Sequence, residues 1–234
     1  MGLFDSLKGK ALTPEERRDK SNARIKKMGI ACLENLPTIE SSSDVKLKDL
    51  DVVCKRAIAC LLSASCASTI NQGDDVEKTI NFHITLLQRY GLTKDDLLPK
   101  ERAVFDNRYS DQNLIDVVWS YEIYWTLIWA MDLITDKEMD EPITICNVER
   151  AIAILMETSG DYEFFKGICK LRDIEKILDM LDLYYRYHWA CEEKRLNPQT
   201  DIGKLYSDVV MERRRGLEWL VSDKKDWNDI SLDT

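Results

Sequence analysis

The stretch DQNLIDVVWSYEIYWTLIWAMDLI at residues 111–134 is apolar on nearly every face of the helix that its spacing predicts. A membrane span is about this long, but Asp116, Glu122 and Asp132 argue against one. A charge near the centre of a membrane helix costs about 3 kcal/mol. We therefore expect 111–134 to form the buried central helix of a globular fold.

The rest of the chain also favours helices. Nine glycines and five prolines in 234 residues are too few for the many tight turns of a β-sandwich or barrel. Apolar spacing, helix caps and breakers predict further helices at 14–28, 50–69, 75–90, 147–157, 161–169, 173–195 and 205–221. The fold class is all-α. We expect one multi-helix domain over 13–234 around the central helix, preceded by a flexible segment at 1–12.

The charge balance limits the kinds of partner. Lys and Arg number 33 against 42 Asp and Glu, which gives a net charge of −9 and would repel nucleic acid. The sequence MGLFDS at 1–6 matches a myristoylation pattern, but it is short enough to arise by chance. We expect no nucleic-acid partner, no stable membrane association, no signal peptide and a cytoplasmic location.

The seven cysteines form no CxxC pair, and they fall mostly in apolar helical stretches. An odd, scattered set is typical of reduced core thiols rather than of a disulfide framework. The spacing of metal ligands is also missing. The sequence therefore predicts no metal and no cofactor.

Glu122 is the most informative single residue of the central helix, because its neighbours Tyr121, Ile123, Tyr124 and Trp125 would desolvate its carboxylate. A buried carboxylate needs a cationic partner. The candidates are Arg150, Arg186 and Arg213. A structural ion pair is favoured over a functional carboxylate.

The segment LYYRYHWAC at 183–191 places His188 on an inward stripe, one turn from Cys191. A Cys–His pair suggests a nucleophile and its base. This spacing on one helix rarely aligns the sulfur with the imidazole, so a hydrogen-bonded core histidine is favoured. Asp182 and Arg186, four residues apart, are expected to form a pair on the helix surface.

The final residues DWNDISLDT at 226–234 cannot continue a helix. We expect Trp227 to insert into the core and so fix the terminus. The tail acids Asp226, Asp229 and Asp233 are expected to meet the arginine triplet at 213–215.

Five segments together resemble an uncharacterised, mainly bacterial family, the domain of unknown function DUF4272. They are ENLPTIE at 34–40, WSYEIYWTLIWAMDLI at 119–134, LYYRYHWAC at 183–191, VVMERRRGLEWL at 209–220 and the tail at 226–234. The resemblance draws attention to Glu122, Arg186, His188, Trp189, Glu212, Arg213, Trp219, Trp227 and Asp233. The family commonly has a histidine where this chain has Arg214 and an asparagine where it has Glu218, which weakens any mechanism that uses that histidine as a base.

Two hypotheses of function follow. The first is a non-catalytic protein-interaction module, for example an immunity-type protein that neutralises a basic toxin; it rests on the lack of a catalytic triad, metal cluster, phosphate loop or redox pair in the sequence. The alternative is an enzyme or small-ligand binder with a polar site around Glu122, Arg186, His188 and Arg213. The full candidate polar cluster is Glu122, Arg186, His188, Glu212, Arg213 and Asp233.

Overall fold

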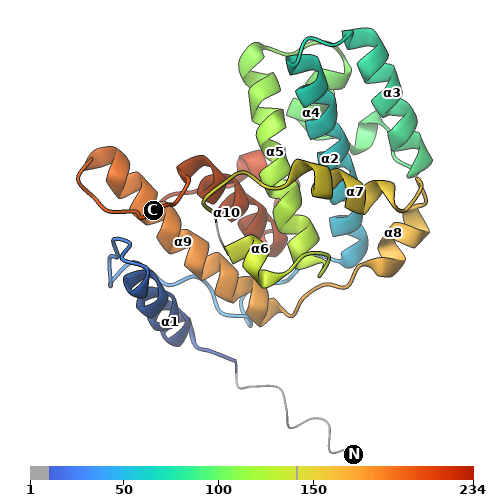
Figure 1. Cartoon of the computed structure of the whole chain (residues 1–234). Coiled ribbons are helices and arrows are strands. Elements are labelled where there is room, and N and C mark those ends of the chain that lie inside the picture. Colours follow the sequence, from blue (N-terminus) through green and yellow to red (C-terminus); the bar gives the residue numbers. More distant parts are fainter. Residues whose placement is uncertain (1–10, 141) are drawn as a thin grey trace, which may run out of the picture.

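The computed structural model describes residues 11–140 and 142–234. Within these residues it contains ten α-helices and no strand, which confirms the all-α class (Figure 1). Residues 1–10 of the expected flexible segment, and with them the myristoylation pattern, lie outside the described residues. In the part of the chain that is described, no helix is both long and apolar enough to cross a membrane.

The helices follow one another with short connections, except for the irregular stretch between the first two. Their bounds are α1 Pro14–Lys27, α2 Leu50–Asn71, α3 Val76–Arg89, α4 Pro99–Phe105, α5 Asp111–Ala130, α6 Asp136–Asp140, α7 Val148–Met156, α8 Tyr162–Ile168, α9 Ile174–Leu196 and α10 Ser207–Val221, with 3-10 turns η2 at Lys94–Asp96 and η3 at Trp227–Asp229.

Helix α5 is the centre of the fold, as its composition predicts. Every residue from 120 to 130 is buried, and the helix packs mainly against α2 and α10 (Figure 1). Alanine, serine and cysteine side chains on α2, such as Ala57, Cys60 and Ala64, permit close helix approach. At Gly216 of α10, an added Cβ would lie only 3.0 Å from Cβ of Thr126.

Helix α5 ends at Ala130, and not at Ile134 as the apolar run suggested. Asp132 takes a left-handed conformation with φ of 63°, and the Leu133 N–H turns back to the Ile128 carbonyl at 2.9 Å. The Trp129 carbonyl accepts the Asp132 N–H at 3.0 Å and also the Arg172 guanidinium at 2.6 Å. A residue in this conformation with a 6→1 bond is a common helix end, so the apolar side chains of 131–134 belong to a turn.

Two short helices, α4 and α6, were not expected from the sequence. Helix α4 begins with Pro99, a favoured first helical residue, and the Leu98 N–H donates to the Glu101 carboxylate at 2.8 Å. Seven residues give too little periodicity to identify a helix. This helix matters because it forms one wall of the cleft described below.

Candidate functional site

Three successive arginines on α10 point in three directions, because neighbouring helical residues are about 100° apart around the axis. Arg213 points into the core toward Glu122, Arg214 toward His188 and the C-terminal tail, and Arg215 toward Glu212. The candidate polar cluster is thus divided among separate environments and does not form one site.

Glu122 and Arg213 form a closed ion pair in the core. Both side chains are 2% exposed, and Nε of Arg213 lies 2.8 Å from Oε2 of Glu122. The second oxygen, Oε1, accepts the Cys146 N–H at 2.6 Å. Arg213 also donates through Nη1 to the Met139 carbonyl at 3.1 Å and to the Tyr184 hydroxyl at 3.4 Å. Of the three arginines named as possible partners of Glu122, Arg213 is therefore the one that binds it.

Arg186 and Asp182 also form a buried pair, so the prediction of a pair on the helix surface was wrong. Their side chains are 2% and 0% exposed, with Nε–Oδ2 at 2.9 Å and Nη2–Oδ1 at 2.8 Å. Arg186 donates further to the Pro37 carbonyl at 3.3 Å. The segment 34–40, in which Leu36 and Ile39 are buried, covers this part of α9. The spacing of residues within one helix cannot show that a distant segment of the chain packs over them.

His188 is buried and bonded to Arg214. Nη1 of Arg214 lies 2.7 Å from Nδ1 of His188, while Nε2 of the ring is 3.9 Å from the Glu192 carboxylate. Burial, assisted by the charge of Arg214, lowers the pKa of His188 to about 4. Within the described residues no hydrogen bond joins His188 to Cys191. The environment is that of a neutral core histidine rather than of a base beside a nucleophile.

The C-terminal tail is held by its backbone and by Trp227. Arg214 donates to the carbonyls of Leu232 and Asp233, each at 3.1 Å. The Asp233 carboxylate is exposed and accepts the Ser231 hydroxyl at 2.5 Å. The tail thus meets the arginine triplet at Arg214, as expected, but through backbone carbonyls: among the described residues no tail aspartate forms an ion pair with the triplet, and that part of the prediction was wrong. Extended backbone offers unpaired carbonyls that a guanidinium can satisfy.

Trp227 inserts into the core as expected. It is buried, and its ring meets Trp219 edge-on at 6.0 Å between centroids. The Arg56 guanidinium lies over its face at 5.0 Å. This aromatic anchor also closes one end of the cleft that Glu212 lines.

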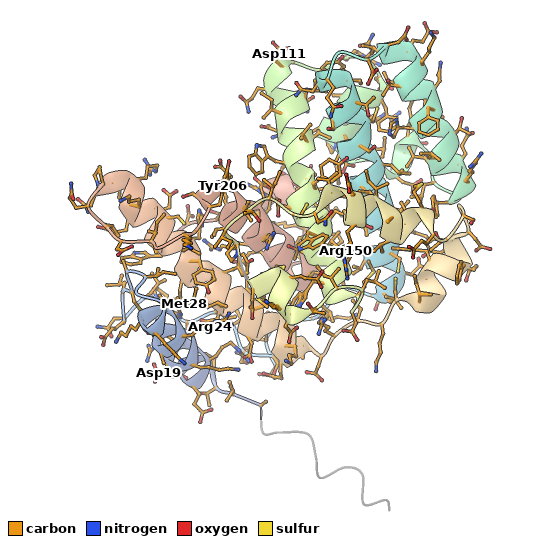
Figure 2. All side chains as sticks on the ribbon, in the orientation of Figure 1. Asp19, Arg24, Met28, Asp111, Arg150 and Tyr206 are labelled. Atoms are coloured by element: carbon orange, nitrogen blue, oxygen red, sulfur yellow. The ribbon has the colours of Figure 1, made fainter. Side chains whose placement is uncertain are left out.

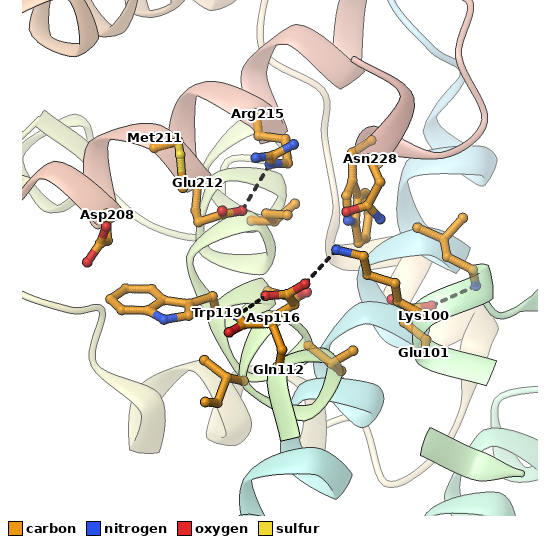
Figure 3. Close-up of a pocket in the computed structure, with 16 residues that line it drawn as sticks. Lys100, Glu101, Gln112, Asp116, Trp119, Asp208, Met211, Glu212, Arg215 and Asn228 are labelled. Atoms are coloured by element: carbon orange, nitrogen blue, oxygen red, sulfur yellow. Dashed lines mark hydrogen bonds and ion pairs between the residues drawn. The ribbon is translucent and has the colours of Figure 1, made fainter. Parts of the chain in front are cut away.

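Glu212 is the member of the candidate cluster that lines a cleft. This cleft, which we call the α5–α10 cleft, has a volume of about 310 Å³ and lies between α4, α5, α10 and η3 (Figure 3). Its lining consists of Leu98, Lys100, Glu101, Gln112, Ile115, Asp116, Val117, Trp119, Ser120, Ile123, Asp208, Met211, Glu212, Arg215, Trp227 and Asn228.

Two ion pairs lie within the lining of the cleft, Lys100 with Asp116 and Arg215 with Glu212 (Figure 3). Nζ of Lys100 lies 2.6 Å from Asp116, which also accepts Nε2 of Gln112 at 2.8 Å. Although burial acts in the other direction, these two bonds lower the pKa of Asp116. Nε of Arg215 lies 3.2 Å from Glu212, but burial outweighs this pair and raises the pKa of Glu212.

Glu101 also lines the cleft, and sequence reasoning missed it together with α4. Its Oε2 accepts Nη2 of Arg56 at 2.5 Å and the Leu98 N–H at 2.8 Å. Its Oε1 is buried and has no hydrogen-bond partner among the described residues. Burial raises the pKa of Glu101 despite the nearby Arg56 charge. The Pro99 that precedes it was the signal that could have indicated this helix.

The described residues offer no obvious metal centre. They contain no group of three or more His, Cys, Asp or Glu side chains placed to hold a metal ion. In the cleft, the carboxylates of Asp116 and Glu212 are instead neutralised by neighbouring cations. All seven cysteines are free thiols, and six of them are buried.

Arg214 and Glu218, where the resemblance led us to expect a histidine and an asparagine, contact each other. The Arg214 guanidinium lies 3.3 Å from the carboxylate of Glu218, one turn later on α10. No curated protein and no solved structure matches the chain. A family model described as a domain of unknown function, DUF4272, matches residues 17–230, and the chain belongs to that family.

Proposed function

We propose that this protein is a non-catalytic binding module whose partner is a basic protein. The observation that carries the proposal is an exposed apolar face at the mouth of the α5–α10 cleft, bordered by carboxylates. We call it the Tyr206 face; it consists of Ile115, Trp119, Ile143, Ile145 and Tyr206. A toxin neutralised by a bound immunity-type protein would be one partner of this kind.

We assign to the Tyr206 face side chains from three segments of the chain. Ile115 and Trp119 are one turn apart on α5, and the Trp119 ring lies 6.1 Å from the Tyr206 ring. The Tyr206 N–H donates to the Pro142 carbonyl at 2.8 Å, so the backbone at Pro142 lies against Tyr206, which Figure 2 labels, and Ile143 and Ile145 follow one and three residues further along the chain. Ile115 is 41% exposed, Tyr206 42% and Ile145 59%.

Contiguous exposed apolar side chains with a polar border are typical of interaction sites, whereas single exposed apolar residues are ordinary. The border here is acidic. Four carboxylates line the cleft, on Glu101, Asp116, Asp208 and Glu212. Lys100 and Arg215 in the lining and Arg56, which pairs with Glu101, offset three of them, and Asp208 remains in excess. With a net charge of −9 for the whole chain, this excess would attract a basic partner and orient it.

The alternative of a catalytic site at the candidate polar cluster has less support. Glu122, Arg186 and Arg213 are buried in pairs whose hydrogen bonds are made within the protein. His188 is buried, and its Nδ1 is occupied by Arg214. A substrate would have to break these pairs before it could reach the groups. Contacts that stabilise the packing of the helices therefore explain the cluster better than a catalytic site does.

The experiment is affinity capture from an extract of the source organism, with the full chain as bait. We expect a stoichiometric basic partner whose binding weakens as ionic strength rises. Ile145→Glu should weaken the purified complex at least about tenfold, because it places a charge in the apolar contact. The control is Phe164→Glu, a change at a side chain of similar exposure on α8, away from the face (Figure 1).

Three results would contradict the proposal: no stoichiometric partner, an acidic partner, or a complex that Ile145→Glu and Phe164→Glu affect equally. Circular dichroism of both variants establishes that each keeps its helices, so that a loss of binding reports on the face itself.

A further inference from the structure

We propose that the α5–α10 cleft receives the cationic head of one basic side chain of the partner, a guanidinium or ammonium group that donates several N–H bonds; this rests on the function proposed above. The cleft opens beside the Tyr206 face, since Ile115 and Trp119 belong to both. Its volume of about 310 Å³ is at the small end of ligand pockets and suits a single side chain.

Among the described residues, two acceptors of the cleft have no cation of the protein against them: the Asp208 carboxylate and one oxygen, Oε1, of Glu101. The Asp208 carboxylate is exposed and belongs to no ion pair among the described residues. Glu101 is 2% exposed, and its Oε1 has no protein donor in the described part of the chain. A buried carboxylate oxygen without a donor is costly, so a multi-donor cation would be stabilised there.

The two buried carboxylates of the cleft, on Glu101 and Glu212, would both gain from the same guest. Burial raises the pKa of Glu101 and of Glu212, which means that their ionised forms are poorly solvated in the cleft. Each already has one arginine neighbour, yet burial outweighs it. A second cation nearby would offset this loss of solvation.

An anionic guest fits less well. Lys100 and Arg215 are the two cations of the lining, and they lie 2.6 Å from Asp116 and 3.2 Å from Glu212. An anion would have to displace these carboxylates and then face the remaining acids. Lys100 and Arg215 therefore stay paired with the cleft's own carboxylates. The acceptors that remain favour a guest of positive charge.

The aromatic side chain at the mouth agrees with a cation. Trp119 is partly exposed and lines the cleft, with Tyr206 beside it. The face of an indole attracts guanidinium and ammonium groups, more strongly when water is excluded. At the other end the Trp227 face is already covered by Arg56, so Trp119 is the aromatic surface open to a guest.

The test uses three probes on the ¹⁵N-labelled full chain: the N-acetyl amides of arginine, lysine and norleucine, at matched ionic strength. We expect either cationic probe to shift the indole N–H signal of Trp119, assigned through Trp119→Phe, with weak millimolar binding. Neutral norleucine amide should leave that signal unmoved. Whether arginine or lysine binds more tightly identifies the head group. If norleucine amide shifts the signal as much as the cationic probes do, the cleft assignment is overturned. It is also overturned if no probe shifts the signal.

Two variants locate the binding. Asp208→Asn changes an exposed side chain and should lower the affinity of the protein for the cationic probe about fivefold, as expected for one partly solvated charge pair. Glu101→Gln replaces the free oxygen and should weaken it further, provided that circular dichroism shows an intact fold. Glu163→Gln, at an exposed acid on α8, is the control and should change nothing.

The partner complex separates this inference from the function on which it rests. A complex that loses affinity with Ile145→Glu but keeps it with both Asp208→Asn and Glu101→Gln overturns the cleft assignment and leaves the interaction face standing. A complex that is insensitive to Ile145→Glu overturns the proposed function, whatever the probes show.

Discussion

Nη1 of Arg214 donates to Nδ1 of His188 across 2.7 Å, and a guanidinium has no lone pair to accept a proton in return. His188 is therefore neutral, with its hydrogen on Nε2. Protonation at Nδ1 would bring two donors together beside a fixed positive charge. This contact therefore makes the stability of the fold depend on whether His188 is protonated.

The first prediction concerns the pH dependence of stability. Burial and Arg214 lower the pKa of His188 to about 4, from an ordinary value near 6.5. Between these values the unfolded chain holds a proton that the folded chain does not. The contribution of His188 to the free energy of unfolding is therefore fully present above pH 6.5. It falls by up to about 3 kcal/mol as the pH drops toward 4.

Urea unfolding of the wild type and of His188→Asn at several pH values measures this effect. Asparagine offers an oxygen to Arg214 but does not titrate. The difference in unfolding free energy between the two proteins should shrink on acidification from pH 6.5 to 4. Parallel pH profiles would refute the prediction, and His83, unchanged in both proteins, cancels in the comparison.

Much of the fold could be predicted because its signals are local. Thr13 and Glu16 form the capping box that begins α1, and Asp75 and Asn147 cap α3 and α7 as the sequence indicates. The apolar run of α5 required burial on all sides. Helices α4 and α6 escaped notice because seven and five residues are too short for a periodic pattern.

The candidate site was less predictable because it depends on packing between distant segments. The choice of Arg213 over Arg150 as the partner of Glu122 is made by how α10 crosses α5. One part of the arrangement could have been predicted from the sequence. Three successive residues of a helix point in different directions, so the arginines at 213–215 could not all face one site. The cleft itself needs α4, which the sequence did not reveal.

The second prediction tests the ion pair of Glu122 and Arg213. Glu122→Leu leaves a buried guanidinium without its carboxylate and should lower the unfolding free energy by about 3–5 kcal/mol. The double variant Glu122→Leu/Arg213→Met removes both charges and should recover most of that loss. A double variant no more stable than the single one would show that the pair itself, and not the orphaned charge, provides the stability. Chemical denaturation of the three proteins decides this.

The third prediction concerns the approach of α10 to α5. An added Cβ at Gly216 would lie 3.0 Å from Cβ of Thr126 and 3.1 Å from its Cγ2, and a β-branched side chain fixed in the core cannot easily move away. Gly216→Ala should therefore destabilise the protein by about 1–3 kcal/mol, even though alanine favours helix more than glycine does.

Gly167 provides the matched control, because it lies in α8 with nothing within 4 Å of its would-be Cβ. Gly167→Ala should raise the thermal midpoint slightly, through helix propensity alone. If both alanine variants change stability in the same direction, the close approach of α10 to α5 is not what requires a glycine at 216.

The last prediction separates the two ways in which the C-terminal tail is held. Trp227 contributes an apolar anchor against Trp219 and Arg56, whereas Arg214 holds the carbonyls of Leu232 and Asp233. Trp227→Ala should lower the unfolding free energy by about 3–5 kcal/mol, since it empties a large buried site. Asp233→Ala should have almost no effect, because Arg214 binds the backbone of this residue and not its carboxylate. A marked loss of stability in Asp233→Ala would mean that the side chain pairs with the arginines after all, and would restore the electrostatic account of the tail that the sequence suggested.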